Sequence, residues 1–280
     1  MRDAVFVVGM GRSGTSALTR VLSLCGAALP LAPLAANHGN PTGYWEPALS
    51  IAVNDRFLSE RASSWYDATV PARYDAASAE SRRFVADIAG VLAAGFESDG
   101  PLVVKDPRIS TLLPYWADAA SLIGFVTKIV HVFRRPESVA ASLAVRDELS
   151  AAQSNALWLK YNLVAERDAR GFPRVFVAYE DLMFDWRAVI ASCIERLDLS
   201  LPLFDRRSDA VNAFLSPSLD HHAAVVADTA DEHQALIART YRLLNDAKHG
   251  APDLAAFDAA LEAYAATEPV PIAPPLATRN

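Results

Sequence analysis

Residues 4–26 read AVFVVGMGRSGTSALTRVLSLCG, and this stretch decides the fold that we expect. The apolar run over residues 4–8 predicts a buried β-strand, which leads directly into a glycine-rich turn over residues 9–14. From Thr15 onward the apolar residues recur at helical spacing. Glycines let backbone N–H groups approach a ligand closely, and the N-terminus of a helix favours negative charge. The stretch therefore predicts an anion-binding loop between a strand and a helix.

The glycines of this loop match a first phosphate-binding pattern. Gly9, Gly11 and Gly14 fit G-x-G-x-x-G, which binds dinucleotides. That pattern also requires a second strand that ends in an acidic residue about 20 positions later. Residues 29–46 read LPLAPLAANHGNPTGYWE, a loop-type sequence without a strand. The dinucleotide interpretation is therefore weak.

Two further patterns compete for the same loop. Gly9, Gly14 and Ser16 fit the Walker pattern G-x-x-x-x-G-K-[ST], but Thr15 stands where the phosphate-clamping lysine belongs. In the third pattern the cation lies upstream in the loop, as Arg12. Such a loop, with one arginine and backbone amides, suffices to hold a sulfuryl group, because that group carries less negative charge than a terminal phosphoryl group. The third pattern fits best.

A second motif, FRRPESVAASL, covers residues 133–143. Arg134 ends an apolar strand-type run, and Ser142 follows eight residues later, in the second turn of the next predicted helix. Pro136 stands at the first turn of that helix, where its missing N–H does no harm. An arginine and a serine in this arrangement can bind one phosphate together. A third motif, Tyr179-Glu180-Asp181, follows the fourth predicted strand.

Because they carry these three motifs, residues 4–197 resemble sulfotransferases that use 3′-phosphoadenosine 5′-phosphosulfate (PAPS). The resemblance implies that the 3′-phosphate is bound by Arg134 and Ser142 and that Tyr179 lies near the adenosine. It also implies a 5′-phosphosulfate loop, whose residues here are Gly11, Arg12, Ser13, Gly14, Thr15 and Ser16.

The chain departs from the cytosolic sulfotransferases after the second predicted strand. Those enzymes carry Lys-Thr-His there, with the histidine as base, whereas this chain has Lys105-Asp106-Pro107. The sequence is similar to the tyrosylprotein and bacterial branches, and the tyrosylprotein branch implies a glutamate base after the first helix. That residue is Glu46 here, and Arg12 with Lys105 would stabilise charge on the departing phosphate.

Other residues remain candidates for the base or for contact with the acceptor. His38 and Asp106 are alternatives to Glu46, and the more distant candidates are His221 and His222. The aromatic residues that can stack on an acceptor, or belong to the core, are Tyr44, Trp45, Trp65 and Tyr66.

Predicted strands over residues 4–8, 101–104, 128–133 and 174–178 are separated by predicted helices. Such alternation indicates an α/β fold with a parallel sheet, flanking helices and all strand-end motifs at one edge. We expect one domain over residues 1–267, with the P-loop-like 5′-phosphosulfate loop, a helical insertion at about 47–98 and a helical C-terminal part at about 206–267. Residues 268–280 form a proline-rich tail that we expect to be unpacked.

Bulk properties narrow the function. The 280-residue chain has a formal net charge of -7, which argues against a general nucleic-acid binder. Its two cysteines, Cys25 and Cys193, fall on apolar helix faces, so neither a disulfide framework nor a metal cluster is expected. The N-terminal apolar run is too short for a signal peptide and no stretch has membrane-spanning length, which favours a cytoplasmic protein without a membrane partner.

The sequence thus predicts a PAPS-dependent sulfotransferase that acts without a metal and releases adenosine 3′,5′-bisphosphate. The expected acceptor is a hydroxyl, less readily an amine, of a small molecule or carbohydrate. The alternatives are a P-loop nucleotide or small-molecule kinase and a non-catalytic nucleotide-binding protein. The sequence indicates no particular oligomeric state.

Overall fold

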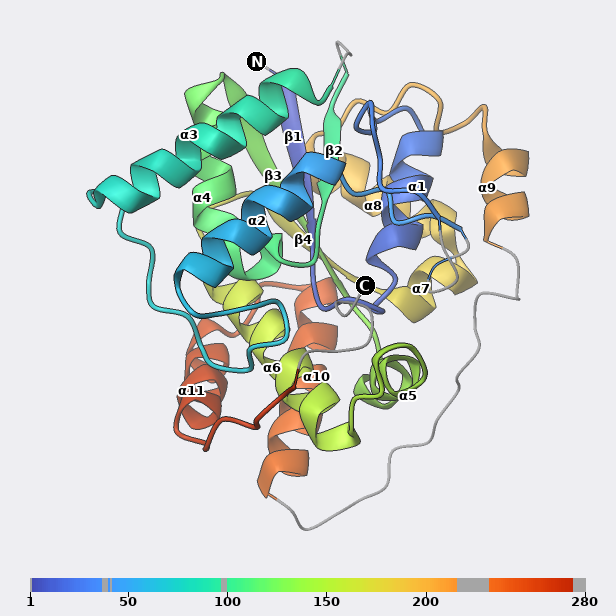
Figure 1. Ribbon diagram of the computed structural model, residues 1–280. Coiled ribbons are helices and arrows are strands. Elements are labelled where there is room, and N and C mark those ends of the chain that lie inside the picture. Colours follow the sequence, from blue (N-terminus) through green and yellow to red (C-terminus); the bar gives the residue numbers. More distant parts are fainter. Residues whose placement is uncertain (1, 37–39, 41, 97–99, 216–231, 274–280) are drawn as a thin grey trace.

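The computed structural model describes residues 2–36, 40, 42–96, 100–215 and 232–273 (Figure 1). Its centre is a four-stranded sheet in the order β2-β1-β3-β4, with every pairing parallel. The expected α/β fold with a parallel sheet is confirmed. The strands are β1 (Arg2–Val8), β2 (Leu102–Lys105), β3 (Phe125–Phe133) and β4 (Arg174–Ala178).

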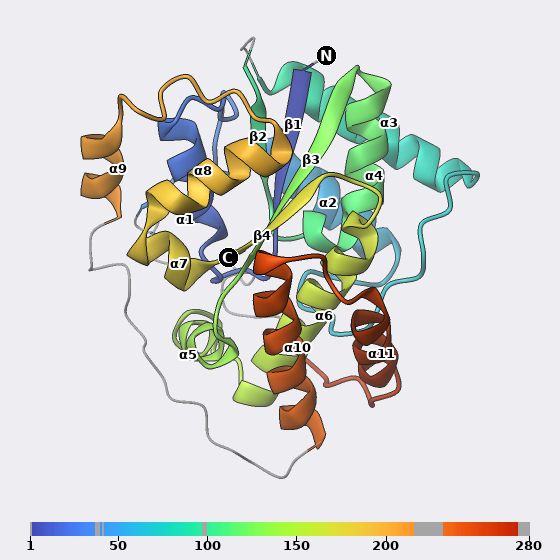
Figure 2. The ribbon, with the colours of Figure 1, turned by 180° about the vertical axis from the view of Figure 1, so that it is seen from behind.

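Helices cover both faces of this sheet (Figures 1 and 2). On one face, α1 (Thr15–Leu24) and α8 (Trp186–Leu197) pack on Val5, Val7 and other valines. The opposite face carries Phe6 and Val8, because successive strand residues point to opposite sides. There the covering helices are α2 (Ala48–Glu60), α3 (Ala79–Ala94) and α4 (Ile109–Leu122).

Helix α4, which lies between the second and third strands, was given no residue range in the sequence analysis. Apart from the exposed Asp118 and Ser121, α4 is buried over most of its surface, and Ile109, Leu113 and Trp116 are fully buried. A helix that is apolar over most of its surface lacks the one-sided pattern by which a surface helix is recognised. Pro114 inside the helix also argues against a helix on local grounds. The burial of α4 between the sheet and neighbouring helices outweighs that local preference.

The remaining helices build a second core beyond the end of β3. They are α5 (Pro136–Asp147), α6 (Ala151–Ala169), α10 (Glu232–His249) and α11 (Leu254–Ala265), and their buried residues form one cluster. Two further helices are short: α7 (Tyr179–Phe184), which the sequence analysis missed, and α9 (Ser208–Phe214), which lies within the expected helical C-terminal part.

The expectation of an unpacked tail is wrong for residues 268–273. Val270 and Ile272 pack against the second core, and Gln153 donates a hydrogen bond to the carbonyl of Pro271 at 2.9 Å. Val270 and Ile272 are two residues apart, so in an extended chain both side chains lie on the same side and can contact the helices. Within the described ranges, no helix is both long and apolar enough to cross a membrane.

Candidate active site

The glycine-rich loop lies against the ends of β3 and β4. Gly9 has φ 132°, and a Cβ atom there would lie 2.0 Å from the carbonyl oxygen of Val132. Gly14 has φ 87°, and a Cβ atom there would lie 2.1 Å from the ring of Tyr179. Ser110 of α4 accepts a 2.8 Å hydrogen bond from the Gly9 N–H and donates one to its carbonyl at 3.0 Å. Only glycine fits at these two positions, so the loop is held close to three neighbouring elements.

Arg12 joins the loop to the second motif. Its backbone has φ 70°, a left-handed conformation that is costly for a residue with a side chain and clusters at functional sites. Its Nε donates a 2.8 Å hydrogen bond to Ser142 Oγ. Arg134 lies 4.5 Å from the ring centre of Tyr179 and donates a long, 3.5 Å hydrogen bond to the Arg12 carbonyl. The structure therefore brings together four residues that the sequence analysis predicted to bind PAPS: Arg12, Arg134, Ser142 and Tyr179.

A third arginine joins this group and was missed by the sequence analysis. Burial lowers the pKa of the Arg12 guanidinium, and the charges of Arg146 and Arg134 lower it further. Arg146 is paired with Asp147 at 2.6 Å. Three cations with one such carboxylate among them can attract an anion. Arg146 follows Ser142 by four residues, which places both on one face of α5, and that spacing was the available signal.

The loop also contains an unsatisfied hydroxyl. Ser13 is fully buried, and its Oγ has no hydrogen-bond partner among the residues that the structure describes. A buried polar atom without a partner is costly, and such atoms often mark ligand sites. Thr15 is buried at the start of α1, and Ser16 Oγ donates to the Tyr44 carbonyl at 3.4 Å. The donor groups of the loop fit an anionic ligand, including the phosphosulfate end of PAPS.

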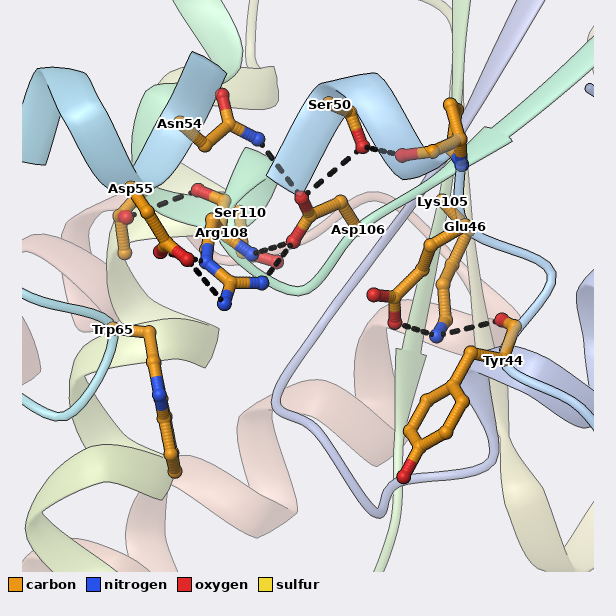
Figure 3. Close-up of polar contacts among 12 residues, drawn as sticks. Tyr44, Glu46, Ser50, Asn54, Asp55, Trp65, Lys105, Asp106, Arg108 and Ser110 are labelled. Carbon is orange, nitrogen blue, oxygen red and sulfur yellow. Dashed lines mark hydrogen bonds and ion pairs between the residues drawn. The ribbon is translucent and has the colours of Figure 1, made fainter. Parts of the chain in front are cut away.

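Glu46, in the loop before α2, forms a buried ion pair with Lys105 at the end of β2, the other strand that neighbours β1 (Figure 3). Lys105 ends β2, and its Nζ lies 2.5 Å from Glu46 Oε1 and 3.0 Å from the Tyr44 carbonyl oxygen. The Leu34 N–H donates to the Glu46 carbonyl at 2.7 Å and so fixes the backbone. Glu46 Oε2 makes no hydrogen bond within the part of the chain that the structure describes. One carboxylate oxygen is thus held, and the other is open.

Burial raises the pKa of Glu46 above its ordinary value. The positive charge of Lys105 opposes this shift, and the negative charge of Asp106 adds to it. A carboxylate whose pKa is raised toward neutrality is a better general base than an exposed one. The geometry and the protonation behaviour of Glu46 both suit a base.

Asp106, the nearest alternative base, is fully buried and fully engaged. One carboxylate oxygen accepts from Ser50 at 3.3 Å and from Asn54 at 3.0 Å, and the other accepts from the N–H of Arg108 at 3.0 Å and its Nη1 at 3.1 Å (Figure 3). Four hydrogen bonds leave its oxygens committed to holding α2 against the end of β2. The other candidates, His38, His221 and His222, lie outside the described residues.

A cavity of about 290 Å³ opens beside Glu46. Gly11 of the loop lines it together with Arg108 and Arg146, so the cavity reaches the loop and the arginine group. Tyr44 and Trp65 line it as well, whereas Trp45 and Tyr66 do not. The other lining residues are largely apolar: Met10, Leu34, Ile51, Pro107 and Tyr161. Within the described ranges, no group of three or more histidine, cysteine, aspartate or glutamate residues is placed to bind a metal ion.

Comparison with known proteins identifies the fold. No family model and no curated protein sequence matches the chain. Among solved structures, the chain is similar to the sulfotransferase domain of the Synechococcus PCC 7002 olefin synthase, with 17% identity, 86% of this chain and 96% of that chain covered, and a TM-score of 0.50. It is also similar to the sulfotransferase domain of the curacin biosynthetic pathway, with 14% identity, coverages of 86% and 98%, and a TM-score of 0.52. The chain therefore has the sulfotransferase fold.

Proposed function

We propose that this protein is a PAPS-dependent sulfotransferase that transfers a sulfuryl group to a hydroxyl of a small molecule. One observation carries the proposal: the Glu46 carboxylate faces a cavity that Gly11 of the anion-binding loop also lines. A base and an anion site thus meet at one cavity, as transfer between a bound anion and a hydroxyl requires. The sulfotransferase fold supports the same activity.

The donor would be bound by the group of arginines and by the loop. Arg134 and Ser142 would bind the 3′-phosphate, and Arg12 with the loop N–H groups the 5′-phosphate. In the structure Arg12 donates to Ser142, so donor binding would replace that contact with hydrogen bonds to phosphate oxygens. When bound, PAPS supplies an activated sulfuryl group.

Glu46 would act as the general base. Its open Oε2 would accept the hydroxyl proton of the acceptor, while Lys105 holds Oε1 and so fixes the carboxylate. The Lys105 ammonium has three N–H donors, and two are engaged by Glu46 and the Tyr44 carbonyl. The third is available to stabilise negative charge on the departing phosphate, together with Arg12.

The rival functions predict different ligands. A kinase would bind ATP with magnesium, and a non-catalytic protein would bind a nucleotide without turnover. We expect calorimetry to show binding of adenosine 3′,5′-bisphosphate but not of ATP–magnesium, because Thr15 replaces the Walker lysine. Sulfuryl transfer from PAPS to a panel of alcohols and phenols should persist in excess EDTA. Binding of ATP–magnesium in preference to the bisphosphate, or transfer that requires magnesium, would favour kinase activity over sulfuryl transfer.

A further inference from the structure

The cavity beside Glu46 has flat aromatic walls. Figure 3 shows Trp65 and Tyr44 on either side of an open space, with Glu46 and Arg108 along its upper edge. Trp65 is supported by the edge-to-face ring of Tyr66 at 5.5 Å, and Lys105 Nζ lies 6.0 Å from the Tyr44 ring centre. Aromatic side chains with supported rings favour a flat, apolar ligand body.

Arg108 presents unused hydrogen-bond donors to this space. A guanidinium has five N–H groups. Asp55 accepts from Nε at 2.5 Å and from Nη2 at 3.1 Å, and Asp106 accepts from Nη1 at 3.1 Å. Two N–H groups, one on each terminal nitrogen, have no acceptor within the described ranges. Figure 3 shows this end of the guanidinium pointing from between the two aspartates toward the space between Trp65 and Tyr44.

The charges around this end of the cavity disfavour an anionic ligand group. Asp55 and Asp106 both pair with Arg108, and Glu46 pairs with Lys105. Arg146, which also lines the cavity, is paired with Asp147. A ligand carboxylate on the spare N–H groups of Arg108 would lie close to the carboxylates of Asp55 and Asp106, which already neutralise that guanidinium. A neutral oxygen can accept both N–H groups of Arg108 without that repulsion.

We infer that the acceptor is a compact, neutral, flat hydroxy compound with a second oxygen, a carbonyl or a hydroxyl. Its reacting hydroxyl faces Glu46, its flat body lies between Trp65 and Tyr44, and its second oxygen accepts hydrogen bonds from Arg108. This assignment rests on the proposed sulfuryl transfer. Arg108 is then the residue that selects the acceptor, and Asp55 positions it by fixing the guanidinium.

Matched phenols test this assignment. Hydroxyacetophenones and ethylphenols have nearly the same shape but differ in one carbonyl oxygen, and hydroxybenzoates add a negative charge. Each is offered with the substituent at the ortho, meta and para positions, and kcat/KM is measured with saturating PAPS. We expect an acetyl compound to exceed its ethyl partner by about tenfold or more at one position at least, because a hydrogen bond to a charged donor is worth that much. The hydroxybenzoates should be the poorest acceptors.

The acetyl group also changes the reactivity of the phenol, so variants isolate the protein's part. Arg108→Lys keeps the charge but removes the paired N–H groups, and the acetyl-to-ethyl ratio should fall severalfold toward one. Arg56→Lys, on an exposed residue of α2, should leave the ratio unchanged. Because the readout is a ratio, partial loss of stability in the Arg108 variant does not obscure it.

The outcomes separate this inference from the proposed function. An unchanged ratio in Arg108→Lys, no acetyl preference at any ring position, or preference for the hydroxybenzoates overturns the inference alone. Bisphosphate binding without transfer to any phenol does the same. Failure to bind the bisphosphate, with no sulfuryl transfer to any acceptor, overturns both.

Discussion

Replacing Glu46 by glutamine tests the role of the buried pair most directly. The change keeps the size of the side chain and an acceptor for Lys105, but it removes the group that would take the acceptor proton. We expect turnover to fall by about 10²–10⁴-fold, the usual contribution of a general base. Affinity for adenosine 3′,5′-bisphosphate should stay nearly unchanged, because Arg134 and Ser142 lie on other elements.

The same variant should also lose stability, which the sequence did not suggest. Lys105 is 2% exposed and its ammonium lies 2.5 Å from the carboxylate. An amide oxygen is a weaker acceptor than a carboxylate, and the ammonium stays buried. Since the Tyr44 carbonyl remains, we expect a loss of about 1–3 kcal/mol, less than the cost of removing a buried partner outright. The melting temperature should fall by about 2–4 °C for each kcal/mol.

The pH dependence gives an independent readout. The rate should rise with pH as Glu46 ionises, and because burial raises its pKa, this rise should lie above the ordinary range of a glutamate. Glu46→Gln should abolish that limb of the profile. The assay is sulfuryl transfer at saturating PAPS across the acidic range, with calorimetry of the bisphosphate alongside.

Glu60→Gln is the matched control, since Glu60 lies on α2 and its carboxylate pairs with Arg83 at the surface. It should leave turnover, its pH profile and bisphosphate affinity unchanged. Full activity of Glu46→Gln, or an unchanged acidic limb, would remove Glu46 from the mechanism and refute the reasoning.

Two other substitutions test the donor site and the core. Arg134→Ala should weaken bisphosphate binding by about 10–100-fold in calorimetry and leave adenosine 5′-phosphate binding nearly unchanged; equal losses would contradict the 3′-phosphate assignment. Burial lowers the pKa of His131 to about 4, and its Nε2 donates a 3.0 Å hydrogen bond to Asn162 Oδ1. Since the unfolded imidazole titrates near 6.5, stability is present above about pH 6.5 and is lost as pH falls toward 4, by about 2 kcal/mol between pH 7 and 5. In urea unfolding at both pH values, His131→Gln should lack this loss, and an equal loss in both proteins would contradict it.

The glycine-rich loop and the Arg134–Ser142 motif were predictable because they are local. The strand, the glycine turn and the helix start lie within residues 4–26, and their spacing alone predicts an anion site. Arg134 and Ser142 are eight residues apart across one strand end and one helix turn, so their proximity also follows from local geometry. The parallel sheet followed from the alternation of strands and helices.

Other features depend on segments that are distant in the sequence. Helix α4 has only a small polar face, Asp118 and Ser121, so its sequence pattern indicates a helix weakly, and its burial depends on the layers around it. The tail over residues 268–273 is rich in proline, yet Val270 and Ile272 find apolar partners on α-helices elsewhere in the chain. The composition of such a segment does not predict its packing, because the packing depends on which surface of the folded chain lies beside it.

The sequence alone determined which chemical groups stand at the strand ends, because glycine spacing, strand pattern and helix starts act over short distances. Only the tertiary structure decided how they pair. Lys105 meets Glu46 across 59 residues, Arg12 meets Ser142 across 130, and Arg108 turns its spare N–H groups toward the cavity because Asp55 holds its other edge. Such contacts depend on strand order and on which neighbours take up each hydrogen bond, and both arise when the whole chain packs.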